Sequence, residues 1–110
     1  MAQFVFLYRR ESRPAGSPEQ MQQRMQKWQA WFQALTTEGH LKDRGLPLEV
    51  TGAVVGGKKS VSDGPYAEKD LVIGFSLVEA RDQAHAGALA AGCPICDEGG
   101  YVEVRPVMAM

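Results

Sequence analysis

The chain has 110 residues, the length of one domain, and residues 1–110 are predicted to form a single domain. Its formal net charge of -1 gives no electrostatic drive toward nucleic acid or an anionic membrane surface, so neither is expected as a partner. No apolar run approaches the roughly 18 residues of a membrane span, the start MAQFVFLYRR lacks the features of a signal peptide, and two cysteines without an export signal favour a cytoplasmic location.

The first predicted element is a strand over residues 4–8, FVFLY, a short apolar run rich in aromatic side chains. Phe4, Phe6 and Tyr8 would share one face, and the two residues between them would share the other. Both faces are therefore apolar, and such a strand is expected to lie centrally in a sheet that is covered on both sides.

A long helix is predicted over residues 18–38. Ser17 can cap its N-terminus, and Gln20 completes an S-x-x-Q capping box. Gly39 is the expected stop. Apolar side chains recur at helical spacing along one stripe: Met21, Met25, Trp28, Phe32 and Leu35.

A β-hairpin is predicted next. Residues 48–55 are rich enough in β-branched side chains to form a strand, and Gly56-Gly57 signals a turn. Residues 58–62 would return antiparallel until Asp63-Gly64-Pro65 breaks the strand. The two lysines at the turn are expected to be solvated.

The remaining elements are a strand over residues 71–78, an Ala-rich helix from Asp82 to near Gly92, and a last strand over residues 100–107. Within 71–78, alternation places Gly74 and Ser76 on one face and Ile73, Phe75 and Leu77 on the other.

The order of these elements reduces to βαββαβ, an α+β ferredoxin-like fold with an antiparallel sheet and two helices on one face. The other face would carry Tyr101, Glu103 and Arg105 if Val102 and Val104 face the helices. Because this face and the two-faced first strand need a cover, we expect a homodimer in which two sheets face each other across a cavity.

Several segments together resemble the YCII-related family, in particular its DGPF branch. The matching stretches run from residue 3 to residue 107: FVFLY, SPEQM, VSDGPYAEKD, IGFSLVEA, GCP and GGYVEVRP. In this chain Tyr66 stands where the branch name has Phe. The resemblance implies a ferredoxin-like fold with dimers of the dimeric α/β-barrel type, in a family without a secure reaction, and a regulatory setting linked to sigma factors.

Some YCII-like relatives pair a histidine on the first helix with an aspartate in a proposed catalytic dyad. The predicted helix 18–38 contains no histidine, since His40 follows its stop and His85 lies on the second helix. That dyad cannot be carried over to this chain, and both histidines are expected to face solvent.

Asp63 has two interpretations. Asp before Gly-Pro can cap a turn by accepting backbone N–H groups, or it can be a carboxylate at a cavity mouth that acts as an acid or base. Tyr66 beside it would supply a flat lining surface with a polar tip.

Glu103 and Arg105 also have two interpretations. They can form a solvated edge or an ion pair that crosses between subunits, or they can be the polar floor of a cavity in which Arg105 binds an anion. Tyr8 would join them as a ligand-binding residue if its face is the open one.

Cys93 and Cys96 form a lone C-x-x-C after a helix C-terminus, the wrong end for a redox pair. A zinc site needs four ligands, and the chain has no second pair with the right spacing. No metal or other cofactor is expected, and the spacing of Cys93 from Leu89 suits a small buried side chain.

Two classes of function remain open. The first is a non-catalytic protein that binds a small organic molecule in a cavity of its dimer, in a regulatory setting. The alternative is an enzyme that acts on a small metabolite with Asp63 as acid or base. The sequence identifies neither the ligand nor a reaction.

Overall fold

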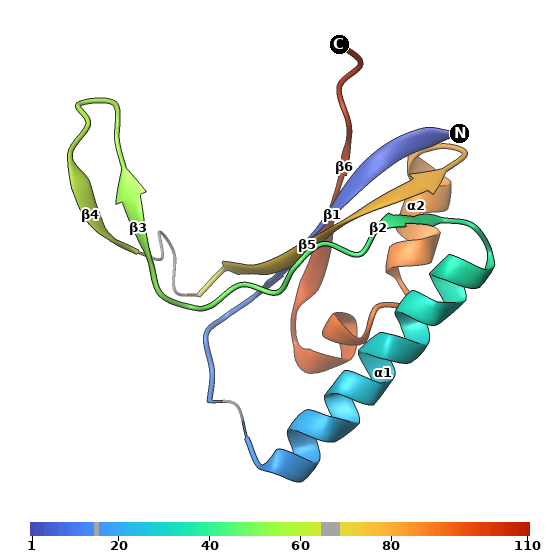
Figure 1. Cartoon of the computed structure of the whole chain (residues 1–110), viewed down its shortest axis with the longest axis horizontal. Helices are drawn as coiled ribbons and strands as arrows, with labels where there is room; N and C mark the ends of the chain where they lie inside the picture. The colour runs from blue at the N-terminus through green and yellow to red at the C-terminus, as the bar shows by residue number, and fades with distance from the viewer. Residues whose placement is uncertain (15, 65–68) are drawn as a thin grey trace.

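The computed structural model describes residues 1–14, 16–64 and 69–110 of the chain. Its centre is a four-stranded antiparallel sheet in the order β2-β5-β1-β6, with both helices packed on one face (Figure 1). The strands of this sheet are β1 (Ala2–Arg10), β2 (Leu41–Asp43), β5 (Leu71–Ala80) and β6 (Tyr101–Pro106), and the helices are α1 (Pro18–Thr37) and α2 (Gln83–Ala90). This is the predicted ferredoxin-like α+β arrangement.

Strand β1 lies centrally, as its two apolar faces predict. Phe6 is paired with Ser76 of β5 on one side and with Val104 of β6 on the other. Phe4, Phe6 and Tyr8 point toward the helices and are at most 3% exposed. Because they meet side chains from α1, α2 and the segment after α2, this face of β1 forms the centre of the hydrophobic core.

Helix α1 begins and ends where the sequence predicts. The Ser17 hydroxyl accepts the Gln20 N–H at 3.1 Å, and the Gln20 side chain accepts the Ser17 N–H at 3.0 Å, which completes the capping box. Gly39 follows the helix with a φ of 79°, in the left-handed region that glycine adopts without strain. Both ends of the helix are therefore set by local sequence.

In chain order, the second strand of the four-stranded sheet is β2. The prediction of a strand over residues 48–55 is wrong for its first half. Only Gly52–Val55 (β3) is a strand there, and it pairs with β4 (Val61–Gly64) in a separate hairpin that projects from the body (Figure 1). The segment before it follows β5 irregularly, because Pro47 has no N–H to donate to a ladder. Gly45, with a φ of 73°, packs so closely that an added Cβ would lie 1.7 Å from the Phe75 carbonyl oxygen.

The Asp63-Gly64 pair does not break the return strand of the hairpin but belongs to it. The turn between β3 and β4 extends to Ser60. The Gly56 N–H donates to the Ser60 carbonyl at 3.0 Å, and Lys59 within the turn has a φ of 61°. Strand β4 consequently starts at Val61, later than predicted, and Asp63 is paired with Ala53. Pro65 lies outside the described residues.

The last part of the chain matches the predicted helix and strand and adds one short element. Asp82 caps α2 by accepting the His85 N–H at 2.8 Å. A 3-10 helix, η1 (Pro94–Glu98), then leads into β6. This helix begins with a proline, whose fixed φ suits a first helical position. Within the described part of the chain, no helix is both long enough and apolar enough to cross a membrane.

Candidate functional site

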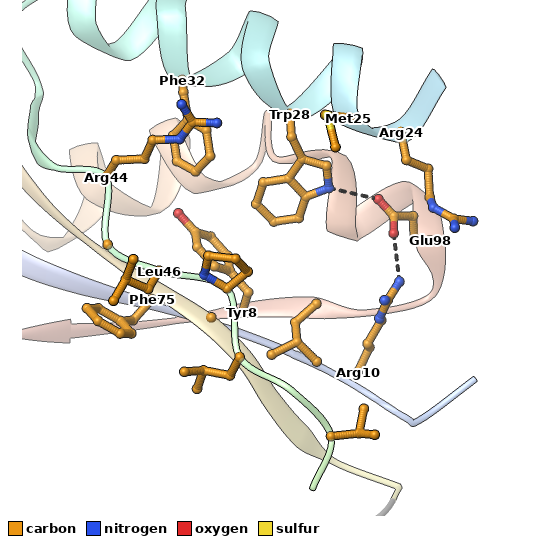
Figure 2. Close-up of a pocket in the computed structure, with 16 residues that line it drawn as sticks. Tyr8, Arg10, Arg24, Met25, Trp28, Phe32, Arg44, Leu46, Phe75 and Glu98 are labelled. Carbon is orange, nitrogen blue, oxygen red and sulfur yellow. Dashed lines mark hydrogen bonds and ion pairs between the residues drawn. The ribbon is translucent and has the colours of Figure 1, made fainter. Parts of the chain in front are cut away.

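A half-open pocket of about 400 Å³ lies between α1 and the sheet (Figure 2). Its walls come from α1, from β1 and β5, from η1, and from the irregular segment that follows β2. The lining side chains that carry the chemistry are Tyr8, Arg10, Arg24, Trp28, Phe32, Arg44 and Glu98. Such a volume lies within the range of protein sites that enclose small organic molecules.

Aromatic rings form the inner wall of the pocket. The apolar stripe of α1 turns Trp28 and Phe32 toward the sheet, and Tyr8 rises from β1 to meet them (Figure 2). Tyr8 and Trp28 pack edge to face with ring centroids 4.9 Å apart, and Trp28 and Phe32 lie 5.8 Å apart. The Arg44 guanidinium covers the Phe32 ring at 4.9 Å from its centroid, a cation–π contact.

The Tyr8 hydroxyl is tied into a buried hydrogen-bond chain. It donates to Ser76 Oγ at 2.7 Å, and Ser76 Oγ in turn donates to the Arg44 carbonyl oxygen at 2.6 Å. Burial raises the pKa of Tyr8 well above the ordinary tyrosine value, against the smaller opposite effect of the Ser76 hydrogen bond. The hydrogen-bond chain fixes the irregular segment to the sheet, and burial keeps the Tyr8 hydroxyl neutral.

The opposite end of the pocket is charged. Arg10 donates to Glu98 Oε1 at 2.8 Å, and the Trp28 indole N–H donates to Glu98 Oε2 at 3.1 Å, so both carboxylate oxygens are engaged (Figure 2). The Glu98 side chain is 14% exposed. The pKa of Arg10 is lowered chiefly by burial, with Glu98 opposing and the positive charges of Arg13 and Arg24 contributing.

The structure separates the site residues that the sequence predicts. Tyr8 faces the helices, so the condition under which it would join Glu103 and Arg105, that its face is the open one, is not met. Strand register places Glu103 and Arg105 on the other sheet face, opposite Leu7 and Val5. The reason is strand alternation, since Tyr8 is paired with Val102 and not with its neighbours.

Asp63, which the sequence predicts to line the site, is not in the pocket wall. Asp63 lies exposed on β4, in the hairpin that stands apart from the four-stranded sheet. Tyr66 lies outside the described residues. Of the other predicted candidates, the three that the structure describes, Asp63, Glu103 and Arg105, do not line the pocket with Tyr8.

On the helix-free face, Glu103 and Arg105 belong to a network of charged and hydroxyl groups. Arg9 donates to Asp70 and to Glu103, each at 3.1 Å, and Arg105 lies 3.4 Å from Glu103. The Tyr101 hydroxyl donates to Asp70, and this bond, followed by that from Arg9, lowers the pKa of Asp70. These ion pairs form within one chain, and both the subunit-crossing ion pair and the polar cavity floor stay predictions.

The two histidines do not both face solvent as expected. The His40 side chain is only 12% exposed, and its ring meets that of His85 edge to face with centroids 5.0 Å apart. His85 Nδ1 accepts the Arg81 backbone N–H at 3.1 Å. This pair could not be predicted, because the two histidines are far apart in the sequence. They meet because the start of β2 lies beside the start of α2.

The two cysteines are free and differ in burial. Cys93 is 1% exposed within the core, as a small buried side chain, and Cys96 is exposed. Burial raises the pKa of the Cys93 thiol to about 12. Among residues 1–14, 16–64 and 69–110, no three His, Cys, Asp or Glu side chains are placed to hold a metal ion.

Sequence reasoning missed the charged residues of the pocket. Arg10 lies beyond the strand predicted over residues 4–8, although β1 extends to include it, and Glu98 lies on the unpredicted η1. One signal was available: Arg24 precedes Trp28 by four residues, which places the two side chains on the same side of α1. Arg44 gave no signal, because its position depends on a segment with irregular backbone.

A family model of the YCII-related domain matches residues 2–110. The chain belongs to the YCII-related family. A search of curated proteins found no match. The family match does not distinguish the DGPF branch, so membership of that branch stays a prediction from the VSDGPYAEKD motif.

The side chains that line the pocket of this YCII-related protein are better suited to binding a ligand than to transferring protons. Its lining carboxylate, Glu98, has both oxygens occupied, and its lining phenol, Tyr8, is buried and already donates to Ser76. Guanidinium groups stay protonated at any physiological pH. The arrangement can recognise a flat ligand through ring contacts and an anionic group through arginine.

Proposed function

We propose that this YCII-related protein binds a small organic molecule in the pocket between α1 and the sheet. The supporting observation is the combination of a cavity of about 400 Å³, an aromatic inner wall and a few polar groups at its ends. Met25 and Leu46, which line the pocket, are 59% and 66% exposed, so the pocket has an open side through which a ligand can enter.

The proposed role is that of a non-catalytic ligand-binding module. It is supported by the hydrogen bonds that Glu98 and Tyr8 already make within the protein. The two residues best suited to proton transfer are therefore occupied, and the rest of the pocket wall is suited to binding. A ligand-responsive module also suits the regulatory, sigma-factor-linked setting that the DGPF resemblance implies. The alternative, catalysis by Asp63, stays a prediction, since Asp63 is exposed on β4 and does not line the pocket.

We propose in addition that a second copy of the chain covers the helix-free face of the sheet. Strand register gathers apolar side chains there from two adjacent strands, and Phe75 is 38% exposed in the single chain. The apolar members of this face are Val5, Leu7, Phe75 and Leu77. Arg105 and Glu103 lie at its edge, where they can form ion pairs with their counterparts in a symmetric dimer.

A thermal-shift screen against a metabolite library tests the binding proposal. A ligand at 100 times its dissociation constant should stabilise the protein by about 2.7 kcal/mol. Met25→Trp should fill part of the pocket and weaken the binding of every hit. Met21→Trp is the matched control, because Met21 lies one turn earlier on α1 and is exposed outside the pocket lining.

Stabilisation of the wild-type protein that is lost in Met25→Trp and kept in Met21→Trp is the expected result. A library without any stabilising compound would contradict the binding proposal. Hits that bind the two variants equally well would place the ligand elsewhere on the molecule.

A further inference from the structure

The β3–β4 hairpin stands apart from the rest of the molecule, and most of its surface is uncovered in the single chain. It forms a two-stranded sheet of its own and projects on the side of the central sheet away from α1 (Figure 1). From Val50 to Asp63, every residue is exposed except the half-buried Val54. A two-stranded hairpin by itself is at best marginally stable in water, so this one is expected to pack on another surface.

The whole chain also exposes more surface than a compact protein of its mass. Its accessible surface is 7732 Å², whereas a folded monomer of 12.0 kDa exposes roughly 6,000 Å². Its radius of gyration is 15.3 Å, against about 13 Å for a compact chain of 110 residues. The excess surface, roughly 1,700 Å², is about twice the area that each partner buries in a standard interface. The chain therefore has the surface to spare that a stable dimer needs.

One face of the hairpin has the chemistry of an interface. Val55 and Val61 lie directly opposite each other in the ladder and are 64% and 69% exposed. Ala53 precedes Val55 by two residues, so strand alternation places it on the same face, where Asp63 is its partner across the ladder. This face is therefore an apolar cluster with a charge at its border, a pattern typical of protein interfaces.

The hairpin lies beside the face of the central sheet that the helices leave uncovered. A cavity of about 300 Å³ at the root of the hairpin is lined by residues 49–54 and by Arg9. Arg9 belongs to the helix-free face, since its guanidinium donates to Glu103 there at 3.1 Å. A second copy seated on the apolar side chains of that face would come within reach of the hairpin. Under two-fold symmetry each copy offers one hairpin and receives one, so that neither valine face stays open.

We propose that the β3–β4 hairpin is an arm that packs on a second copy of the chain through the face formed by Ala53, Val55 and Val61. This inference rests on the proposed dimer and adds a second element to its interface. Contact between the two sheets brings the copies together, and the arm buries the valines that the single chain leaves in water.

The arm also connects the dimer to the ligand pocket. Residues of segment 44–51 form part of the pocket wall, and the segment runs directly into β3. The Leu48 N–H donates to the Ile73 carbonyl at 2.9 Å. Val50, two residues further on, lines both the pocket and the cavity at the root of the arm. An arm held by the second copy therefore holds the Val50 end of the pocket wall.

Sedimentation equilibrium of the full chain tests the arm, with Val55→Thr/Val61→Thr as the variant. Threonine keeps the branched shape and the strand preference of valine but adds a hydroxyl that is costly to bury against an apolar surface. Because the change is made on both arms of the dimer, the dimer dissociation constant should rise by about tenfold or more. Circular dichroism reports whether the variant folds.

Val54→Thr is the matched control, since Val54 lies on the same strand with its side chain on the opposite face, across from Ser62. It should leave the dissociation constant unchanged. Hydrogen exchange provides a second measurement on the wild-type chain, and it decides the question even when a variant fails to fold. The amides of residues 46–55 should exchange more slowly above the dimer dissociation constant than below it.

A dissociation constant that is unchanged in Val55→Thr/Val61→Thr, or that Val54→Thr raises as much, would overturn the arm and leave the dimer through the sheet faces intact. Exchange of residues 46–55 that is the same in monomer and dimer would also overturn the arm alone. A wild-type chain that stays monomeric at every concentration would overturn the proposed dimer and the arm together.

Discussion

Ser76 is fully buried, and its hydroxyl connects two parts of the molecule that carry the pocket. It accepts from Tyr8 and donates to the Arg44 carbonyl, so the ring wall and the irregular segment share one hydrogen-bond chain. Replacing the hydroxyl in the middle of such a chain costs more than replacing one at its end, because it takes a partner from both the buried Tyr8 hydroxyl and the part-buried Arg44 carbonyl.

Ser76→Ala and Tyr8→Phe should therefore differ in cost. Tyr8→Phe removes one bond and leaves the Ser76 donor satisfied, which should lower the free energy of unfolding by about 1 kcal/mol. Ser76→Ala strands both the Tyr8 hydroxyl and the Arg44 carbonyl, and should cost about 2–3 kcal/mol. Urea unfolding measures both; a larger cost for Tyr8→Phe would contradict this hydrogen-bond chain.

The buried thiol of Cys93 should make stability depend on alkaline pH. Its pKa is raised to about 12 from an ordinary value of 9.0, so above pH 9 the unfolded thiol ionises while the folded one stays protonated. Unfolding then releases a proton, and the free energy of unfolding falls with rising pH by at most about 1.4 kcal/mol per unit. Below pH 9 this contribution is fully present.

Urea unfolding between pH 9 and pH 10 checks the contribution, since buried Tyr8 adds its own loss only above the ordinary tyrosine value of 10.0. Cys93→Ala should flatten the slope in this range, and Cys96→Ala, which removes an exposed thiol, should keep it. An unchanged slope in Cys93→Ala would show that the thiol is ionised in the folded protein.

At the scale of elements, the parts of the fold that follow from local sequence could be predicted. Helix α1 carries its capping box, its stripe and its glycine stop within its own residues, and β1 shows its two apolar faces directly. Segment 44–51 could not be predicted, because its path depends on a close approach of Gly45 to β5. The hairpin register also required the turn geometry at Lys59.

The candidate site was less predictable than the fold for the same physical reason. Tyr8 is predicted from its aromatic strand, but Arg44 and Glu98 come from segments without periodic pattern, and Arg10 lies in the part of β1 beyond the predicted strand. Their meeting is a property of tertiary packing. Asp63 and its neighbours were predicted as site residues from a turn-forming sequence. Such a sequence indicates the local backbone conformation and carries no information about which residues lie nearby in the fold.

The hairpin β3–β4 provides a test of Asp63. Asp63 is exposed and paired with Ala53, so Asp63→Asn should leave stability nearly unchanged, and neither stability nor ligand affinity should depend on its charge. Asp63→Ala should cost on the order of 1 kcal/mol if the carboxylate caps a turn, as the sequence predicts. Thermal melts and titration with a hit from the screen measure both effects; altered ligand affinity in Asp63→Asn would return Asp63 to the site.

At the scale of the whole molecule, the sheet has one face under the helices and one without them. Helices α1 and α2 lie on the same side in Figure 1, and strand register gives the opposite side its apolar row and its ion-paired edge. A contiguous apolar patch with a charged rim is typical of an interface between subunits.

Sedimentation at micromolar concentration should accordingly find twice the mass of the chain. Leu77→Glu places a charge in the apolar row and should shift the protein toward the monomer, while Met21→Glu, on the exposed side of α1, should leave the dimer intact. Circular dichroism checks that each variant folds. A single species of one chain's mass in the wild-type protein would contradict the dimer.

The most direct measurement of the central claim is a crystal structure of the protein with a hit from the library screen. Ligand density between α1 and the sheet, against Trp28 and within reach of Arg24, is the predicted result. Density on the helix-free face, beside Glu103 and Arg105 and between two copies of the chain, would contradict the claim and move the site to the other side of the sheet.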